Sequence, residues 1–131
     1  MKLALNGATT MKASLAEDIR AASAAGFDYL EIWASKLRKF LKTGTTAELL
    51  ALFDEHGLKP YSINSIERIT FRDREEHSKL LDECEQLCRI ASEINCPYIV
   101  VVPSPLPHEK SWDDVAKESV RVLGELGRIG Q

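Results

Sequence analysis

The sequence has few of the features that mark specialised protein classes. It contains only three cysteines in 131 residues, too few for a disulfide framework. No stretch approaches the roughly 20 apolar residues that a membrane span requires. Seven glycines and five prolines exclude a collagen-like chain, and 44% hydrophobic with 28% charged residues exclude a disordered tail. The composition therefore predicts an ordinary globular protein without a membrane segment.

The sequence also lacks an excess of charge of one sign. It has 17 Lys and Arg against 20 Asp and Glu, a net charge of -3, so no overall field attracts nucleic acid. The apolar run within residues 1–7 is too short for a secretory signal. Cys84 and Cys88 lie four residues apart within a helical pattern, which favours reduced thiols. We expect a cytoplasmic protein that binds neither nucleic acid nor membrane.

One pattern occurs four times along the chain: a short apolar run, a loop, a capped amphipathic stretch and a stop residue. The predicted strands are Leu3–Asn6, Tyr29–Trp33, Tyr61–Ser65 and Tyr98–Val102. Each helix start combines a capping side chain with an acid three residues later: Ser14 with Glu17, Thr45 with Glu48, Asp73 with Glu76, and Ser111 with Asp114. Three helices are predicted to stop at Gly26, Gly57 and Asn95, residue types that tolerate a left-handed backbone.

Strands about 30 residues apart with a helix between them form βαβ units with a parallel sheet. The fold class predicted is α/β, with four consecutive βα units in a single domain over residues 1–131. A complete eight-fold βα barrel needs roughly 250 residues, so this chain corresponds to half of a TIM barrel. An open flavodoxin-like sheet, which binds ligands or partner proteins at its strand ends, is the alternative fold.

Three segments resemble the first units of a known barrel family. They are residues 25–32 (AGFDYLEI), residues 56–59 (HGLK) and residues 96–103 (CPYIVVVP). These residues closely resemble the xylose isomerase-like, sugar phosphate isomerase/epimerase superfamily, and the similarity spans the whole chain. The superfamily's abasic-site endonuclease branch relies on several strand-end histidines and fits less well, because His56 and His77 are predicted on helices.

The resemblance has consequences for cofactors. Full-length members hold a divalent metal (Mn, Mg, Co or Zn) with carboxylates and a histidine from the later strands, which this sequence does not contain. We therefore assign no metal ligand and no cofactor to the isolated half. The resemblance implies instead that the chain supplies one wall of a sugar pocket.

Alternation along the strands selects the residues that face the interior of a barrel, whose active site lies at the carboxyl ends of the strands. Asn6, Glu31, Ser62 and Asn64 form this polar face, whereas Leu30, Ile32, Tyr61 and Ile63 are predicted to face the helices. Carboxylate and amide groups at one mouth suit hydrogen bonding to sugar hydroxyls. The resemblance places an acid at the end of the second strand beside the pocket, so Glu31 is the leading catalytic candidate. The alternative is a buried structural acid paired with a Lys or Arg.

Trp33 and His108 complete the predicted substrate-binding set with Asn6 and Asn64. Trp33 lies on the same face as Glu31 and can stack on a sugar, although the usual burial of tryptophan favours a core aromatic residue. His108, in the proline-rich segment after the fourth strand, can act in proton transfer or ligation, but exposed loop histidines usually do neither.

Two further groups have simpler explanations. The cations in residues 36–42 can hold a phosphate, but Leu37, Phe40 and Leu41 at helical spacing favour a solvated amphipathic turn. His77, Cys84 and Cys88 share one helical face, which suggests zinc. Their neighbours in the same apolar stripe favour core packing, and no fourth ligand is evident.

Four parallel strands alone leave two open edges, and Tyr98–Val102 is predicted to lie at or near one of them. Two copies total about 262 residues, the size of one barrel, so we expect a homodimer or pairing with a complementary carboxyl-terminal half. The first functional hypothesis is a half-barrel of a sugar isomerase/epimerase that dimerises and has little or no catalysis alone. The second is a sugar isomerase, epimerase or sugar-binding domain that is active as a dimer.

Overall fold

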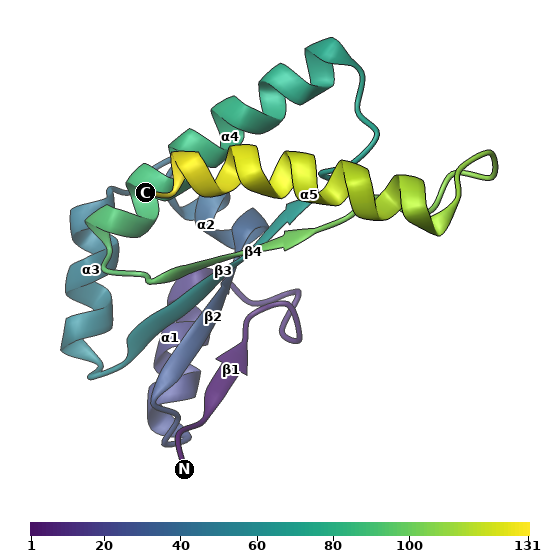
Figure 1. Cartoon of the computed structure of the whole chain (residues 1–131). Helices are drawn as coiled ribbons and strands as arrows, with labels where there is room; N and C mark the ends of the chain where they lie inside the picture. Colours follow the sequence, from purple (N-terminus) through teal and green to yellow (C-terminus); the bar gives the residue numbers. More distant parts are fainter. The chain divides into compact units, whose positions relative to one another are not determined.

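The computed structural model describes the whole chain, residues 1–131, as four strands and five helices (Figure 1). In chain order they are β1 (Ala4–Asn6), α1 (Leu15–Ala24), β2 (Tyr29–Trp33), α2 (Ala34–Phe40), α3 (Thr46–Glu55), β3 (Lys59–Glu67), α4 (Arg74–Glu93), β4 (Tyr98–Val102) and α5 (Trp112–Ile129). All four predicted strands are present, and β2 and β4 have the predicted bounds. No helix is both long and apolar enough to cross a membrane.

The strands form one sheet in the order β1-β2-β3-β4, with parallel pairing of β1 to β2 and of β2 to β3. This sequential order is that of a barrel sector, because a flavodoxin-like sheet reverses direction in its strand order. The half-barrel prediction is thus confirmed and the flavodoxin-like alternative is wrong. As predicted, β4 is an edge strand.

The predicted helix boundaries depend on local hydrogen bonds that the structure contains. Ser14, Thr45 and Ser111 form reciprocal capping boxes with the acids three residues later, and the Glu76 amide donates to Asp73. Gly26 and Gly57 have φ angles of 78° and 60°, and Asn95 has a φ of 56°. These left-handed residues end α1, α3 and α4 as the sequence indicates.

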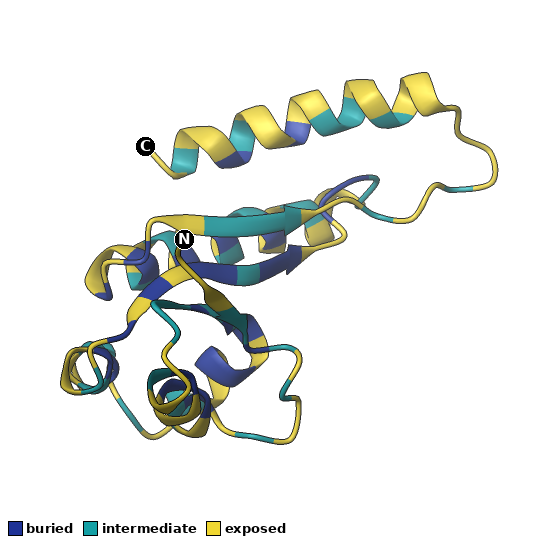
Figure 2. Cartoon of the chain, turned by 90° about the horizontal axis from the view of Figure 1, so that it is seen from below, coloured by how far each residue is buried: buried dark blue, intermediate teal, exposed yellow.

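The chain divides into two compact units, each with its own buried residues. Unit 1 comprises residues 1–65 and 90–100, and unit 2 comprises residues 66–89 and 101–131. In unit 1, α1 packs against β2, α2 and α3, and its core includes Ile19, Leu30 and Phe53. The core of unit 2 includes Leu80 of α4 and Val122 of α5. Figure 2 shows that much of α5 is exposed.

The segment after β2 differs from the prediction of a solvated turn. Residues Ala34–Phe40 form helix α2 directly after β2, and Leu37 is fully buried in it. Lys36 is also buried, with 5% of its surface exposed, because its ammonium group binds an acid on α1. This helix was not predicted because its N-cap residue, Trp33, is not a capping residue type and makes no side-chain capping hydrogen bond.

Tyr61 also differs from its prediction, which placed it toward the helices. The register of β2 with β3 shifts between Leu30 and Glu31, so that Pro60 lies opposite Leu30 and Ser62 opposite Glu31. Tyr61 is the extra residue of this bulge and is 44% exposed. Its ring lies 5.7 Å from that of Tyr29 and 5.5 Å from that of Tyr98. Proline at a strand position favours such an irregularity because it has no N–H to donate.

Candidate functional site

A carboxylate on β2 is surrounded by hydrogen-bond donors from three strands of unit 1. Oε1 of Glu31 accepts from the side-chain amides of Asn6 and Asn64, each at 2.7 Å. Oε2 accepts from the hydroxyl of Ser62, also at 2.7 Å. The four residues predicted as the polar inner face therefore come together as one hydrogen-bonded group, which we call the Glu31 cluster.

Strand register explains why these side chains meet. Asn6 lies opposite Glu31 on β1, and Ser62 lies opposite Glu31 on β3. Side chains two residues apart on a strand share a face, which brings Asn64 to the same group. Leu30 and Ile32 alternate with Glu31 and are fully buried on the other face. The side chains that donate to the Glu31 carboxylate are all neutral, unlike the Lys or Arg partner of a structural ion pair.

The turn after β1 fixes the orientation of the Asn6 side chain. The Ala8 amide donates to Oδ1 of Asn6 at 2.8 Å, which directs the Asn6 amide nitrogen to Glu31. The Gly7 amide donates to the Glu31 carbonyl at 2.9 Å. A Cβ at Gly7 would lie 3.1 Å from that carbonyl oxygen and 3.3 Å from the Trp33 nitrogen, so the close approach favours glycine.

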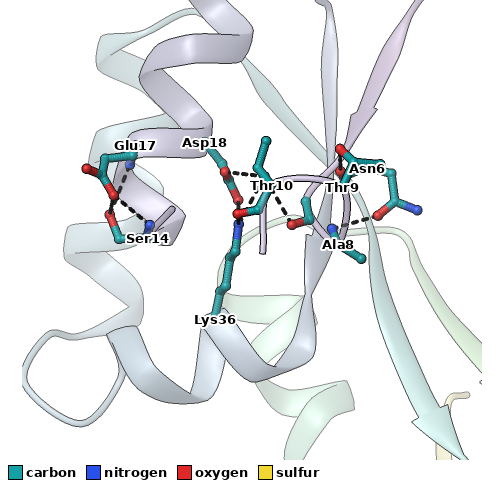
Figure 3. Close-up of polar contacts among 9 residues, drawn as sticks. Asn6, Ala8, Thr9, Thr10, Ser14, Glu17, Asp18 and Lys36 are labelled. Atoms are coloured by element: carbon teal, nitrogen blue, oxygen red, sulfur yellow. Dashed lines mark hydrogen bonds and ion pairs between the residues drawn. The ribbon is translucent and has the colours of Figure 1, made fainter. Parts of the chain in front are cut away.

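A buried ion pair holds the rest of this loop (Figure 3). Nζ of Lys36 lies 2.5 Å from Oδ2 of Asp18, and these side chains are 5% and 1% exposed. Lys36 also donates to the carbonyl and hydroxyl of Thr10, whose hydroxyl donates to Asp18. The three ammonium N–H groups thus all have acceptors. This network was not predicted, although one signal for it exists in the sequence: Asp18 is a charged residue on the helical face that carries Leu15, Ile19 and Ala22.

Trp33 lies at a separate pocket of unit 1. This pocket, of about 310 Å³, is bounded by the loop after β1, the start of α1 and helix α2. Its lining includes Trp33, Phe40, Met11 and three lysines, but no member of the Glu31 cluster. The structure therefore groups Asn6, Ser62 and Asn64 with Glu31. Trp33 lies opposite Asn64 in the sheet and also lines this pocket, and its role as a substrate contact remains a prediction.

His108 lies in unit 2, in the exposed turn between β4 and α5. Hydrogen bonds from Ser104 to the hydroxyl and carbonyl of Thr70 hold the beginning of this segment. The role of His108 as a substrate contact remains a prediction.

The histidine and cysteines of α4 have structural contacts. Nε2 of His77 lies 2.6 Å from a carboxylate oxygen of Glu125 on α5. Cys84 is 4% exposed, and its sulfur lies 4.0 Å from that of Cys88. Burial raises the pKa of Cys84 to about 12, which keeps it a protonated, unreactive thiol.

Metal binding fits the residues of this chain poorly. No group of three or more His, Cys, Asp or Glu side chains is placed to hold an ion. The Glu31 cluster contributes one carboxylate with two amides and a hydroxyl, whereas the implied centre uses carboxylates and a histidine. We therefore assign no catalytic step in this chain to a metal.

Comparison with known proteins agrees with the fold. A family model for the xylose isomerase-like TIM barrel matches residues 19–129. Inosose isomerases of Halalkalibacterium halodurans and Bacillus subtilis are 32% and 31% identical over 133 aligned residues. The alignments cover 100% of this chain and only 47% and 48% of the two isomerases. The chain therefore spans about half the length of these relatives.

The solved structure of the IolI protein with a bound zinc atom has a similar fold over the matched half. It matches with a TM-score of 0.93 and 30% sequence identity, over 100% of this chain and 48% of that one. Its zinc is a property of that longer protein. The family model, the relatives and the sequential strand order together establish that this chain belongs to the xylose isomerase-like TIM barrel family.

Proposed function

We propose that the chain is a single half-barrel domain that forms the substrate-binding wall of a sugar isomerase or epimerase. The observation that carries this proposal is the Glu31 cluster, in which a carboxylate, two amides and a hydroxyl occupy one face of the sheet. Such groups alternate acceptors and donors in the way that neighbouring sugar hydroxyls require. The matching inosose isomerases support a polyhydroxylated cyclic ketone as the substrate class.

Glu31 is the residue that contacts the substrate in this proposal. A carboxylate offers about four acceptor positions, and three are used by Asn6, Ser62 and Asn64. The remaining position, on Oε2, accepts a substrate hydroxyl. The three donors hold the carboxylate in one orientation, so the binding geometry exists before the ligand arrives. The half-barrel binds and orients the sugar but has little or no isomerase activity alone.

Calorimetric titration with inosose tests this role. The wild-type chain is expected to bind saturably, and Glu31→Gln to weaken binding about tenfold or more, the effect of one lost charge-assisted hydrogen bond. Glu55→Gln, at an exposed acid on α3, serves as the matched control and keeps wild-type affinity. Equal affinity in all three proteins would overturn the proposal, and turnover by the isolated chain would overturn its claim of little catalysis.

The second part of the proposal concerns closure of the barrel by a second copy. The edge strand β4 exposes Tyr98 (57%) and Val102 (41%), and α5 exposes Trp112, Val120 and Leu123. An exposed apolar edge strand readily pairs with another chain. A homodimer covers these surfaces and supplies the four further strands that a barrel needs.

Light scattering after size-exclusion chromatography tests closure. The expected mass is twice 14.6 kDa. Val102→Lys introduces a charge at the exposed edge and is expected to give a monomer, whereas Ala51→Lys on the exposed side of α3 leaves the dimer intact. A monomeric wild-type chain contradicts the homodimer and leaves pairing with a complementary half-barrel.

A further inference from the structure

The pocket that contains Trp33 has the chemistry of a second ligand site. Its volume, about 310 Å³, is at the lower end of the range for small-molecule pockets. Met11, Leu15, Trp33 and Phe40 give it apolar and aromatic walls. None of its lining residues belongs to the Glu31 cluster.

The charged residues that line this pocket are all cationic, while the carboxylates next to them are bonded to Lys36 (Asp18) and to the helix cap Ser14 (Glu17). Lys12, Lys36 and Lys39 line it, and no acidic residue does, although the protein as a whole carries a net charge of -3. Lys36 is neutralised by Asp18 and has no donor left for a ligand. Lys12 and Lys39 are exposed and take part in no ion pair of the structure, so two positive charges remain at the rim.

The walls of the pocket are held in place from within. Lys36 links α2 to the loop through Thr10 and to α1 through Asp18, and the capping box of Ser14 fixes the start of α1. Ligand binding therefore requires little ordering of the loop, which lowers its entropic cost. A pocket with aromatic walls and two free cations suits a doubly negative group attached to an apolar body.

We propose that this pocket, between the loop after β1 and helix α2, binds a small phosphate monoester with an apolar or aromatic body. Its ring packs against Trp33 and Phe40, and Lys12 and Lys39 bind the phosphate. Lysine is a suitable phosphate ligand because its ammonium acts as a compact charge with three donors. A phosphate monoester carries close to two negative charges at neutral pH, which matches the two unpaired lysines.

Fluorescence titration with phenyl phosphate tests the proposal. Trp112 is 75% exposed on α5 in unit 2, so Trp112→Phe leaves Trp33 as the only tryptophan reporter. We expect a saturable change in Trp33 fluorescence with phenyl phosphate. Phenol and inorganic phosphate, each offering half of the ligand, are expected to bind at least about tenfold more weakly.

Charge variants in the Trp112→Phe protein identify the site. Lys12→Gln and Lys39→Gln are each expected to weaken binding about tenfold, the effect of losing one charge-assisted contact. Lys42→Gln, at an exposed lysine outside the pocket, is the matched control and keeps the affinity. The proposal is overturned if phenol binds as tightly as phenyl phosphate, or if Lys42→Gln lowers the affinity for phenyl phosphate as much as Lys39→Gln does. It is also overturned if phenyl phosphate does not change the fluorescence of Trp33. Inosose binding is measured separately, so failure of either site leaves the other result interpretable.

Discussion

The amide nitrogen of Asn64 on β3 lies 2.7 Å from the Glu31 carboxylate on β2. The same oxygen accepts from Asn6 on β1, so one acid links three strands. The donors that would orient the carboxylate for the proposed ligand therefore also connect the strands. Changes at Glu31 should consequently be measurable without any ligand.

Glu31→Gln is expected to lower the free energy of unfolding by about 2 kcal/mol, because hydrogen bonds to a charged acceptor are lost and the new amide faces other donors. Urea denaturation measures this loss. The exposed variant Glu55→Gln should change stability by less than about 0.5 kcal/mol. Equal effects of the two substitutions would show that the Glu31 cluster contributes no specific stability.

Lys36→Met should destabilise the chain strongly because it leaves the Asp18 carboxylate buried without its partner. Breaking a buried pair in this way costs about 3–5 kcal/mol. The double variant Asp18→Leu with Lys36→Met should recover much of this loss, since no uncompensated charge remains. Chemical denaturation of the wild-type chain, the two single variants Lys36→Met and Asp18→Leu, and the double variant measures the coupling. A double variant whose loss of stability equals the sum of the two single losses contradicts it.

Two glycines should respond to alanine in opposite directions. At Gly7 a Cβ would lie 3.1 Å from the Glu31 carbonyl and 3.2 Å from the Asp18 carboxylate, so Gly7→Ala should destabilise by about 1–3 kcal/mol. At Gly127, within α5, a Cβ meets nothing within 4 Å, and Gly127→Ala should stabilise by about 0.5–1 kcal/mol. Thermal unfolding distinguishes them, and a stabilised Gly7→Ala would contradict the packing described for the loop.

Acid should weaken the contact between α4 and α5. The hydrogen bond from His77, followed by the charge of Arg121, holds the pKa of Glu125 below its ordinary value of 4.5. An acid whose pKa is lowered by folding stabilises the folded state above its ordinary pKa, and that stability is lost as the pH falls below it. Urea unfolding should show the free energy of unfolding falling between pH 7 and 3. In Glu125→Gln the free energy of unfolding should fall less steeply with pH. An unchanged slope would exclude Glu125 as a contributor.

The sequence predicted most of the fold because its local signals agree with one another. Ser14, Thr45 and Ser111 mark helix starts through their capping boxes, and Gly26 and Gly57 mark helix ends. Period-two alternation similarly selected Glu31 and its partners. These features depend on residues near in sequence or on strand geometry alone.

The features that the sequence did not predict depend on contacts distant in sequence. Lys36 is buried because Asp18 and Thr10 lie within reach after folding, which spacing along the chain does not reveal. Tyr61 is displaced by a bulge whose position depends on pairing with Leu30 and Glu31. In both cases tertiary contacts determine the position of a side chain that the local sequence pattern predicts differently.

Heteronuclear NMR during a titration with inosose tests the proposed sugar-binding wall most directly. The side-chain amide signals of Asn6 and Asn64 report on the groups that touch Glu31. We expect these two signals to shift saturably with inosose in the wild-type chain and not to shift in Glu31→Gln. Binding of inosose that leaves both signals unchanged in the wild-type chain would contradict it.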